Sequence, residues 1–117
     1  MDAALRSLLQ ELERFGEEND ARATRRPEKM LNVTPDTGEL LAVLVVATKA
    51  RRVLEIGTSN GYSTLWLADA ARSVGGTVTT VDILPNKAEM ARQNLARAGL
   101  SGWVRQEVAD AGAFLRQ

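Results

Sequence analysis

The chain has 117 residues, 44% of them apolar and 26% charged, which is typical of one globular domain and too short for two cores. Its 15 basic and 15 acidic residues are interspersed along the sequence, so we expect no nucleic acid as a partner. Cysteine and histidine are absent, which excludes disulfides, thiolate nucleophiles and the usual zinc ligands.

Two helices are predicted before the first strand. Apolar residues at helical spacing predict a first helix that ends at Gly16. Those residues are Leu5, Leu8, Leu9, Leu12 and Phe15. The polar residues 17–29 are predicted to form a solvated connector without a function, so residues 1–29 are read as a helical N-terminal extension. Thr34 suits the cap of a second helix over residues 35–49. Its predicted core face comprises Leu40, Leu41, Leu44, Val45 and Thr48.

Three short strands are predicted in the remainder of the chain. The run Val-Leu-Glu-Ile at residues 53–56 is short, mostly apolar and in part β-branched, and it predicts a strand that is buried on both faces. Residues 77–81 predict a second strand, which Asp82 ends, and residues 103–108 predict a third.

Helices are predicted between these strands. One covers residues 63–71 and stops at Gly75, and another begins at Pro85 and ends before Gly99. The second of these has a predicted core face of Ala88, Ala91, Leu95 and Ala98, and a stub of helix follows from Ala111. This alternation is typical of the βαβαβ half of a doubly wound α/β fold, with parallel strands in the order third, second, first. Residues 1–117 are therefore expected to form a single, incomplete domain.

The loop after the first predicted strand is where such a fold binds ligands. Gly57 allows the backbone to turn close to a ligand, and Gly61 lets the chain enter the next helix. Asp82 ends the neighbouring strand, where its carboxylate can accept both hydroxyl protons of a ribose. The dinucleotide pattern Gly-x-Gly-x-x-Gly is missing, and Glu55 would repel a phosphate but suits the cationic amino-acid end of S-adenosylmethionine. These residues favour a site for that cofactor. Two alternatives stay open, namely glycines that merely shape a turn and an NAD-dependent oxidoreductase half-domain.

Longer stretches of the sequence resemble a known family. They are Asn32-Val33, Gly38, the run Val-Leu-Glu-Ile-Gly-Thr-Ser-Asn-Gly-Tyr-Ser-Thr-Leu-Trp-Leu-Ala at residues 53–68, and Val81-Asp82. Over residues 30–115 the chain resembles the cation-dependent O-methyltransferases, which include the catechol and caffeoyl-coenzyme A O-methyltransferases. The resemblance implies a Rossmann-like methyltransferase fold. It also implies an enzyme (EC 2.1.1.-) that transfers a methyl group from S-adenosylmethionine to a hydroxyl of a small molecule.

The same resemblance implies a set of cofactor-binding residues. Glu55 and Ser63 would hold the amino-acid moiety of the cofactor, and Val33 would pack near its methionine end. Asp82 would bind the ribose hydroxyls, while Ile83 and residues 110–111 would border the adenine. The complete set is Val33, Glu55, Gly57, Thr58, Ser59, Gly61, Ser63, Asp82, Ile83, Asp110 and Ala111. Contact of Asn60 with the cofactor stays open, and Tyr62 is expected to be a packing residue.

The parts of the family that act on the acceptor are not recognisable in this sequence. Family members hold a divalent cation, magnesium, with two aspartates and an asparagine, and a lysine assists the acceptor hydroxyl. No Asp-x-Asp-Lys motif or Asp-Asn pair occurs here, so no catalytic or metal-binding residue is assigned. We expect the chain alone to be inactive. The alternative function is a non-catalytic nucleoside-binding or interaction module derived from such an enzyme.

The predicted partners follow from what borders the first strand and from the apolar runs. Without a fourth strand the first strand becomes a sheet edge, so we expect a homo-oligomer or association through Val53, Leu54 and Ile56. The longest apolar run, residues 40–47, is far shorter than the roughly 20 residues that span a bilayer. The first residues do not resemble a secretory signal. We therefore expect no membrane partner and a cytoplasmic location.

Overall fold

The computed structural model describes residues 1–117 and contains one sheet of three parallel strands, β1 (Arg52–Ile56), β2 (Thr77–Asp82) and β3 (Val104–Val108). The strands lie in the order β1-β2-β3, with β2 in the centre. The register pairs Glu55 with Thr80 and Thr80 with Gln106, so these three side chains point to the same face of the sheet. The predicted α/β fold and its strand order are confirmed.

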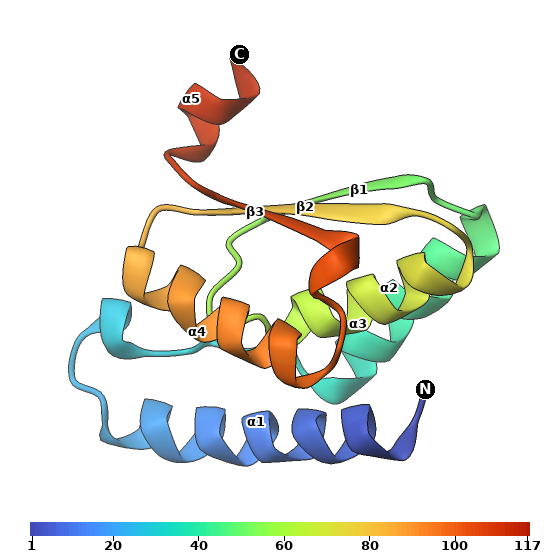
Figure 1. Ribbon diagram of the computed structural model, residues 1–117. Helices are drawn as coiled ribbons and strands as arrows, with labels where there is room; N and C mark the ends of the chain where they lie inside the picture. Colours follow the sequence, from blue (N-terminus) through green and yellow to red (C-terminus); the bar gives the residue numbers. More distant parts are fainter.

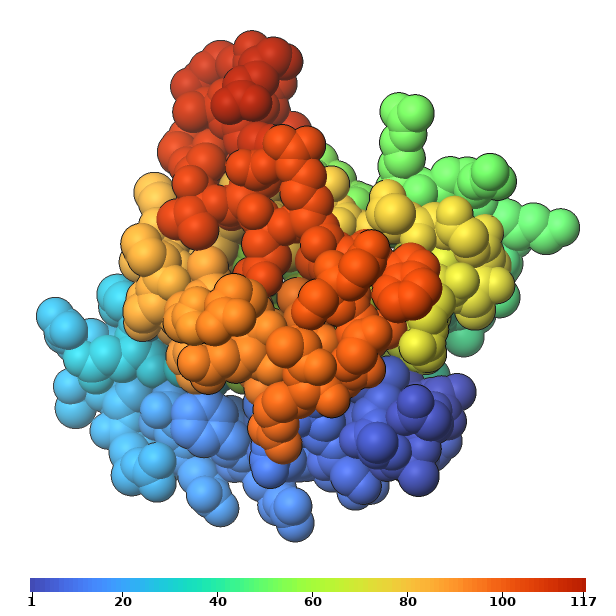
Figure 2. Space-filling model, in the orientation of Figure 1, coloured from blue at the N-terminus to red at the C-terminus, as the bar shows by residue number.

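Four long helices lie on one face of this sheet (Figure 1). They are α1 (Ala3–Arg22), α2 (Pro35–Thr48), α3 (Tyr62–Ser73) and α4 (Pro85–Arg97). The crossover helices α3 and α4 lie against the strands, α2 packs beside α3, and α1 forms the outermost layer. The short helix α5 (Ala111–Leu115) lies on the opposite side of the sheet (Figure 1), and the C-terminal residues protrude from the rest of the molecule in Figure 2. None of the helices is both long enough and apolar enough to cross a membrane.

The core lies between the sheet and α1. Leucines of α1 belong to one hydrophobic cluster with the buried face of α3 and with Val78 of β2, because the amphipathic stripe of α1 faces the interior. The largest fully buried side chains include Tyr62, Leu65, Leu95, Leu100 and Val78. The core face predicted for α4 is confirmed at Ala88, Ala91 and Leu95.

The prediction that the first helix ends at Gly16 was wrong. The helix α1 continues to Arg22, and Gly16 is buried within it. A Cβ at Gly16 would lie 2.5 Å from Nδ2 of Asn32, so the glycine allows the segment before α2 to pack closely against α1. The predicted connector 17–29 therefore contains the last turns of α1 and a 3-10 turn, η1 (Arg26–Glu28).

Two expectations about burial were also wrong. Leu54 and Ile56 of β1 are 49% and 56% exposed, because helices cover one face of the sheet and leave the other bare. On α2, Val45 is buried, but Leu40 and Leu44 are 56% and 50% exposed. Thr48, also predicted in the core, is exposed as well. The cause is that α2 is apolar nearly all round but contacts α3 along only one narrow side, so its other apolar side chains stay exposed.

The predicted helix ends agree with the structure where local chemistry sets them. The hydroxyl of Thr34 accepts a hydrogen bond from the N–H of Thr37, and Pro35 is the first residue of α2. Gly99 has a φ of +69° directly after the end of α4. The third strand begins one residue later than expected, because residues 101–103 form a second 3-10 turn, η2 (Ser101–Trp103).

Candidate nucleoside-binding site

The loop between β1 and α3 carries three residues in left-handed backbone conformations. Gly57 has a φ of +93°, Gly61 a φ of +89° and Ser59 a φ of +49°. No atom lies within 4 Å of the position a Cβ would take at Gly57, so this glycine faces open space. At Gly61 the same position is 3.1 Å from Ala91, which means that this glycine allows α4 to approach the loop. One glycine thus leaves room for a ligand and the other is needed for packing.

Glu55 is held by three hydroxyl groups. Its Oε1 accepts hydrogen bonds from Oγ1 of Thr64 and from Oγ1 of Thr80, the latter at 2.8 Å, and its Oε2 accepts one from Oγ of Ser63. The Thr80 hydroxyl also lies 2.6 Å from Oγ1 of Thr58. Because Oε1 already has two donors, the remaining acceptor capacity of this carboxylate lies on Oε2, next to Ser63.

Asp82 stands at the carboxyl end of the central strand. Its Oδ2 accepts a hydrogen bond from the N–H of Ser59 at 2.8 Å, and its Oδ1 accepts one from the N–H of Leu84 at 2.9 Å. These two bonds fix the carboxylate, which is half-buried. Each oxygen keeps a second lone pair that can accept a hydrogen bond from a ligand.

Two cavities meet at Asp82. The first, of about 240 Å³, lies between the ends of β1 and β2 and the start of α5. Its lining residues include Gly57, Asp82, Ile83, Asp110 and Ala111. The second, of about 400 Å³, lies on the other side of Asp82 and is lined by Ser59, Ile83, Leu84, Lys87 and residues of the 26–31 segment.

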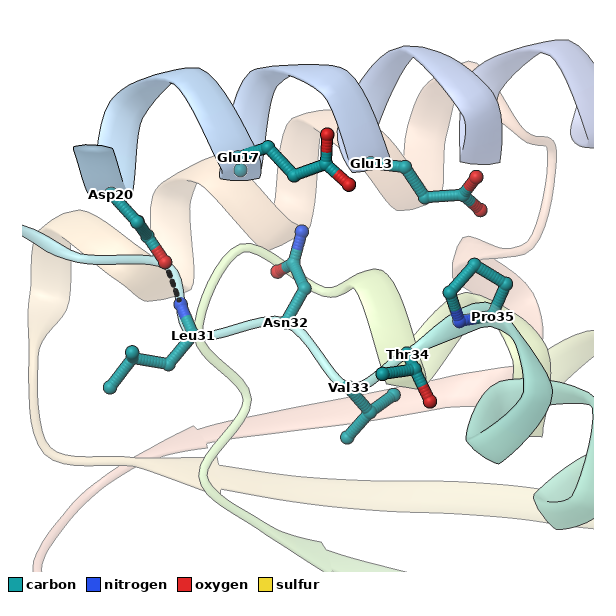
Figure 3. A pocket seen from close by; sticks show the side chains of 9 residues that line it. Glu13, Glu17, Asp20, Leu31, Asn32, Val33, Thr34 and Pro35 are labelled. Atoms are coloured by element: carbon teal, nitrogen blue, oxygen red, sulfur yellow. Dashed lines mark hydrogen bonds between the residues drawn. The ribbon is translucent and has the colours of Figure 1, made fainter. Parts of the chain in front are cut away.

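The remaining predicted site residues lie apart from these two cavities. The carboxylate of Glu55 and the hydroxyl of Ser63 lie between β1 and α3. Thr58, in the loop that joins them, is only 2% exposed. Val33 borders a third cavity, of about 380 Å³, between α1 and residues 31–35. Figure 3 shows that the Val33 side chain points away from α1, whereas Asn32 points toward it. The structure therefore brings together the residues expected around the nucleoside more closely than those expected around the methionine end.

Asn60 and Tyr62 are both buried where the loop enters α3. Asn60 is fully buried, its Oδ1 accepts a hydrogen bond from the N–H of Tyr62, and its carbonyl accepts one from Nδ2 of Asn94. The expectation for Tyr62 is confirmed, because it is 1% exposed. Its hydroxyl donates to Oε2 of Glu13 at 2.6 Å, and burial together with this carboxylate raises the pKa of the phenol.

Sequence reasoning missed four polar residues around the site. Thr64 and Thr80 hold Glu55, and Asp20 and Lys87 hold residues 29–33, a segment that we call the strap. Two of these had a signal in the sequence. Thr80 lies two residues after Val78 and so on the same buried face of β2, and Lys87 lies on the buried stripe of α4 with Ala91 and Asn94. A polar residue in a buried stripe indicates a specific partner.

The open loop at Gly57, the fixed carboxylate at the end of the central strand and the cavities beside it belong to an α/β domain of the Rossmann type and form its candidate ligand site. Comparison with known proteins gives the family. The O-methyltransferase family model matches residues 2–117, and the chain belongs to the O-methyltransferase family.

Curated relatives and solved structures agree with this assignment. The chain is 47% identical over 79 residues to a catechol O-methyltransferase of Mycobacterium tuberculosis, an alignment that covers 68% of this chain and 36% of the relative. It is 36% identical over 87 residues to a catechol O-methyltransferase of Niastella koreensis, covering 74% of this chain and 39% of the relative.

Among solved structures, the O-methyltransferase TomG of Streptomyces achromogenes in complex with SAM gives a TM-score of 0.74 at 35% identity, covering 99% of this chain and 47% of that one. An O-methyltransferase of Bacillus cereus in complex with SAH gives 0.73 at 33% identity, covering 94% and 47%. The chain thus spans less than half the length of these relatives.

The residues present fit one of the two groups that the family implies. An open glycine and a carboxylate with free acceptor positions suit the ribose of S-adenosylmethionine. For a divalent cation the structure brings together no group of three or more acidic side chains that could hold it. We therefore derive no step through a metal ion.

Proposed function

We propose that this chain is the cofactor-binding half of an S-adenosylmethionine-dependent O-methyltransferase, which in the complete enzyme methylates a hydroxyl of a small molecule. The observation that carries the proposal is the Asp82 carboxylate. It is fixed by two backbone N–H groups, it borders two cavities, and it stands beside the open face of Gly57. Relatives solved with SAM and with SAH support the choice of cofactor over other nucleosides.

The proposed roles run along the cofactor from adenine to methionine. Asp82 accepts hydrogen bonds from the ribose hydroxyls, and the side chain of Ile83, 63% exposed, covers one face of the adenine. The backbone at Asp110 and Ala111 closes the adenine end of the first cavity. Gly57, Thr58, Ser59 and Gly61 form the loop between the ribose and the amino-acid end, which Glu55, Ser63 and Val33 contact.

The chemistry in this proposal belongs largely to the cofactor, whose sulfonium supplies an activated methyl group for in-line displacement by a hydroxyl. This chain's residues bind and orient. Oε2 of Glu55 accepts from Ser63, and its free lone pair can accept from the cationic amino group. No acceptor-activating residue is proposed, and we expect no methyl transfer to a catechol by this chain alone, with or without magnesium.

Calorimetric titration tests the cofactor proposal. We expect S-adenosylmethionine and S-adenosylhomocysteine to bind, and NAD to bind at least about tenfold more weakly, because no pyrophosphate-binding glycine pattern is present. Asp82→Ala should weaken both cofactors by about 1.5–3 kcal/mol through the loss of charge-assisted hydrogen bonds. The matched control is Asp36→Ala, an exposed aspartate on α2. Equal binding of NAD, or an unchanged affinity of Asp82→Ala, would refute the proposal.

Association through β1 is the second part of the proposal, and it also favours the alternative of an interaction module. The free edge of β1 continues into an apolar groove of about 580 Å³ between β1 and α2. Its lining includes Leu41, Leu44, Val53, Leu54 and Leu67. Unpaired strand edges with apolar side chains are templates for pairing with a second chain. We expect sedimentation to show a dimer or larger species that Leu54→Lys dissociates, and a monomer at all concentrations would exclude association.

A further inference from the structure

The strap is held against the loop between β1 and α3 by polar contacts at three consecutive residues, 29–31. The N–H groups of Met30 and Leu31 donate to the two carboxylate oxygens of Asp20, at 2.6 and 2.8 Å. The carbonyl of Met30 accepts a hydrogen bond from Oγ of Ser59 at 2.9 Å. The carbonyl of Lys29 accepts one from Nζ of Lys87. Side chains from α1, from the loop between β1 and α3, and from α4 therefore form hydrogen bonds with three residues of the strap.

The contact from Lys87 is unusual because the lysine is buried. Lys87 is 3% exposed, and its Nζ lies 3.8 Å from Sδ of Met30, itself a buried residue. No carboxylate pairs directly with this ammonium group. Burial lowers the pKa of Lys87, while the nearby charges of Asp82 and Asp20 oppose that shift. A buried amine kept at this position needs a structural reason, since an apolar residue would pack there without the cost of desolvation.

The strap conformation needs such contacts because it is not the one that the backbone prefers. Leu31 has a φ of +50°, a left-handed conformation that non-glycine residues rarely adopt. Ser59, which bonds to Met30 from the opposite side, has a φ of +49°. Strained residues persist where surrounding contacts hold them, and such residues gather at ligand sites. The second cavity beside Asp82 lies between these two residues.

We propose that Lys87 is a positioning residue that holds the strap in place as the wall of the cofactor site facing Asp82. Its ammonium group donates a hydrogen bond to the strap carbonyl of Lys29 and lies near two carboxylates with which it makes no direct pair, Asp20 on the strap side and Asp82 on the nucleoside side. Val33 ends the strap two residues after Leu31, so Lys87 also sets the place of the residue assigned to the methionine end. We call the hold of Lys87 on the strap the latch. The role of the latch in cofactor binding rests on the proposed function, whereas its existence does not.

Amide hydrogen exchange in the ligand-free chain tests the latch independently of the cofactor. We expect Lys87→Met, which keeps the length and apolar stem of the side chain, to speed exchange at the Met30 and Leu31 amides by about tenfold or more. Amides in the middle of α3 should keep their rates. The control Arg92→Met replaces an exposed residue of the same helix. Unchanged exchange at Met30 and Leu31 would overturn the proposal.

Calorimetry with two ligands then tests the positioning role. S-adenosylhomocysteine carries the amino-acid arm, whereas 5′-methylthioadenosine carries the same nucleoside without it. Lys87→Met should weaken S-adenosylhomocysteine by about tenfold and leave 5′-methylthioadenosine within about twofold. Equal weakening of both ligands would show that Lys87 acts through the charge of Asp82, and unchanged affinity for both would show no role in binding. Either result overturns the proposal.

A second variant protects the test against loss of folding. Asp20→Asn keeps the shape of the side chain but weakens its hold on Met30 and Leu31, and it should give the same pattern of exchange and affinity as Lys87→Met. Its control is Glu18→Gln, an exposed residue of the same helix. Failure of the unmodified chain to bind S-adenosylhomocysteine would refute the proposed function, while the exchange rates would still decide whether the latch exists.

Discussion

The hydroxyl of Thr80 is predicted to be a main contributor to the stability of the site. Thr80→Val replaces this hydroxyl with a methyl group of similar size at a position that is fully buried. The change removes a 2.8 Å hydrogen bond to the Glu55 carboxylate, and hydrogen bonds to charged groups are worth about 1.5–3 kcal/mol. It also leaves the buried Thr58 hydroxyl, 2.6 Å away, without its partner, at a cost of about 1 kcal/mol.

Together these losses predict a decrease of about 2.5–4 kcal/mol in the free energy of unfolding. For a domain of this size that corresponds to a melting temperature lower by at least about 8 °C. Urea and thermal denaturation followed by circular dichroism would measure both quantities. The control is Thr79→Val, on the bare face of the same strand, which should change stability by less than about 0.5 kcal/mol. If the two variants are equally stable, the hydroxyls around Glu55 do not hold the site as argued.

Two further predictions concern packing and pH. Gly38→Ala should destabilise the chain by about 1–3 kcal/mol in urea denaturation, because its Cβ would lie 2.4 Å from the indole Nε1 of Trp66, whereas Gly102→Ala, with nothing within 4 Å, should be nearly neutral. Equal effects of the two would contradict the close packing of α2 on α3. Burial raises the pKa of Asp20, but its bonds from Met30 and Leu31 outweigh that effect and hold the pKa below its ordinary value. Its contribution to stability is therefore present above the unfolded-state pKa of about 3.9 and is lost as pH falls through the folded-state pKa. The difference in free energy of unfolding between the unmodified chain and Asp20→Asn should shrink from about pH 5 toward pH 3. A difference that grows on acidification would contradict a lowered pKa of Asp20.

Features with a local cause could be predicted from the sequence. Thr34 caps a helix with its own hydroxyl, and Gly99 ends one through its own backbone freedom, so neither depends on distant residues. The strand order also followed from local pattern, because strands alternating with helices allow few topologies.

The errors concern contacts between distant segments. Gly16 has the local signature of a helix end, yet it is required by Asn32, which reaches it from the segment before α2. The exposure of Leu54 depends on which face of the sheet the helices cover, and the short run of residues 53–56 does not contain that information. The contacts of Lys87 and Asp20 with the strap join parts of the chain that no short motif connects.

The place of α1 in the core also has a consequence for folding during synthesis. Leu5, Leu8, Leu9 and Leu12 belong to the main hydrophobic cluster, and the partner helix α3 begins only at Tyr62. At the usual rate of translation, α1 is complete roughly 2.5–10 s before α3 is complete. During that time its leucine stripe has no native surface to pack against. The nascent chain therefore exposes an amphipathic helix with an uncovered leucine stripe until α3 and the sheet have been synthesised.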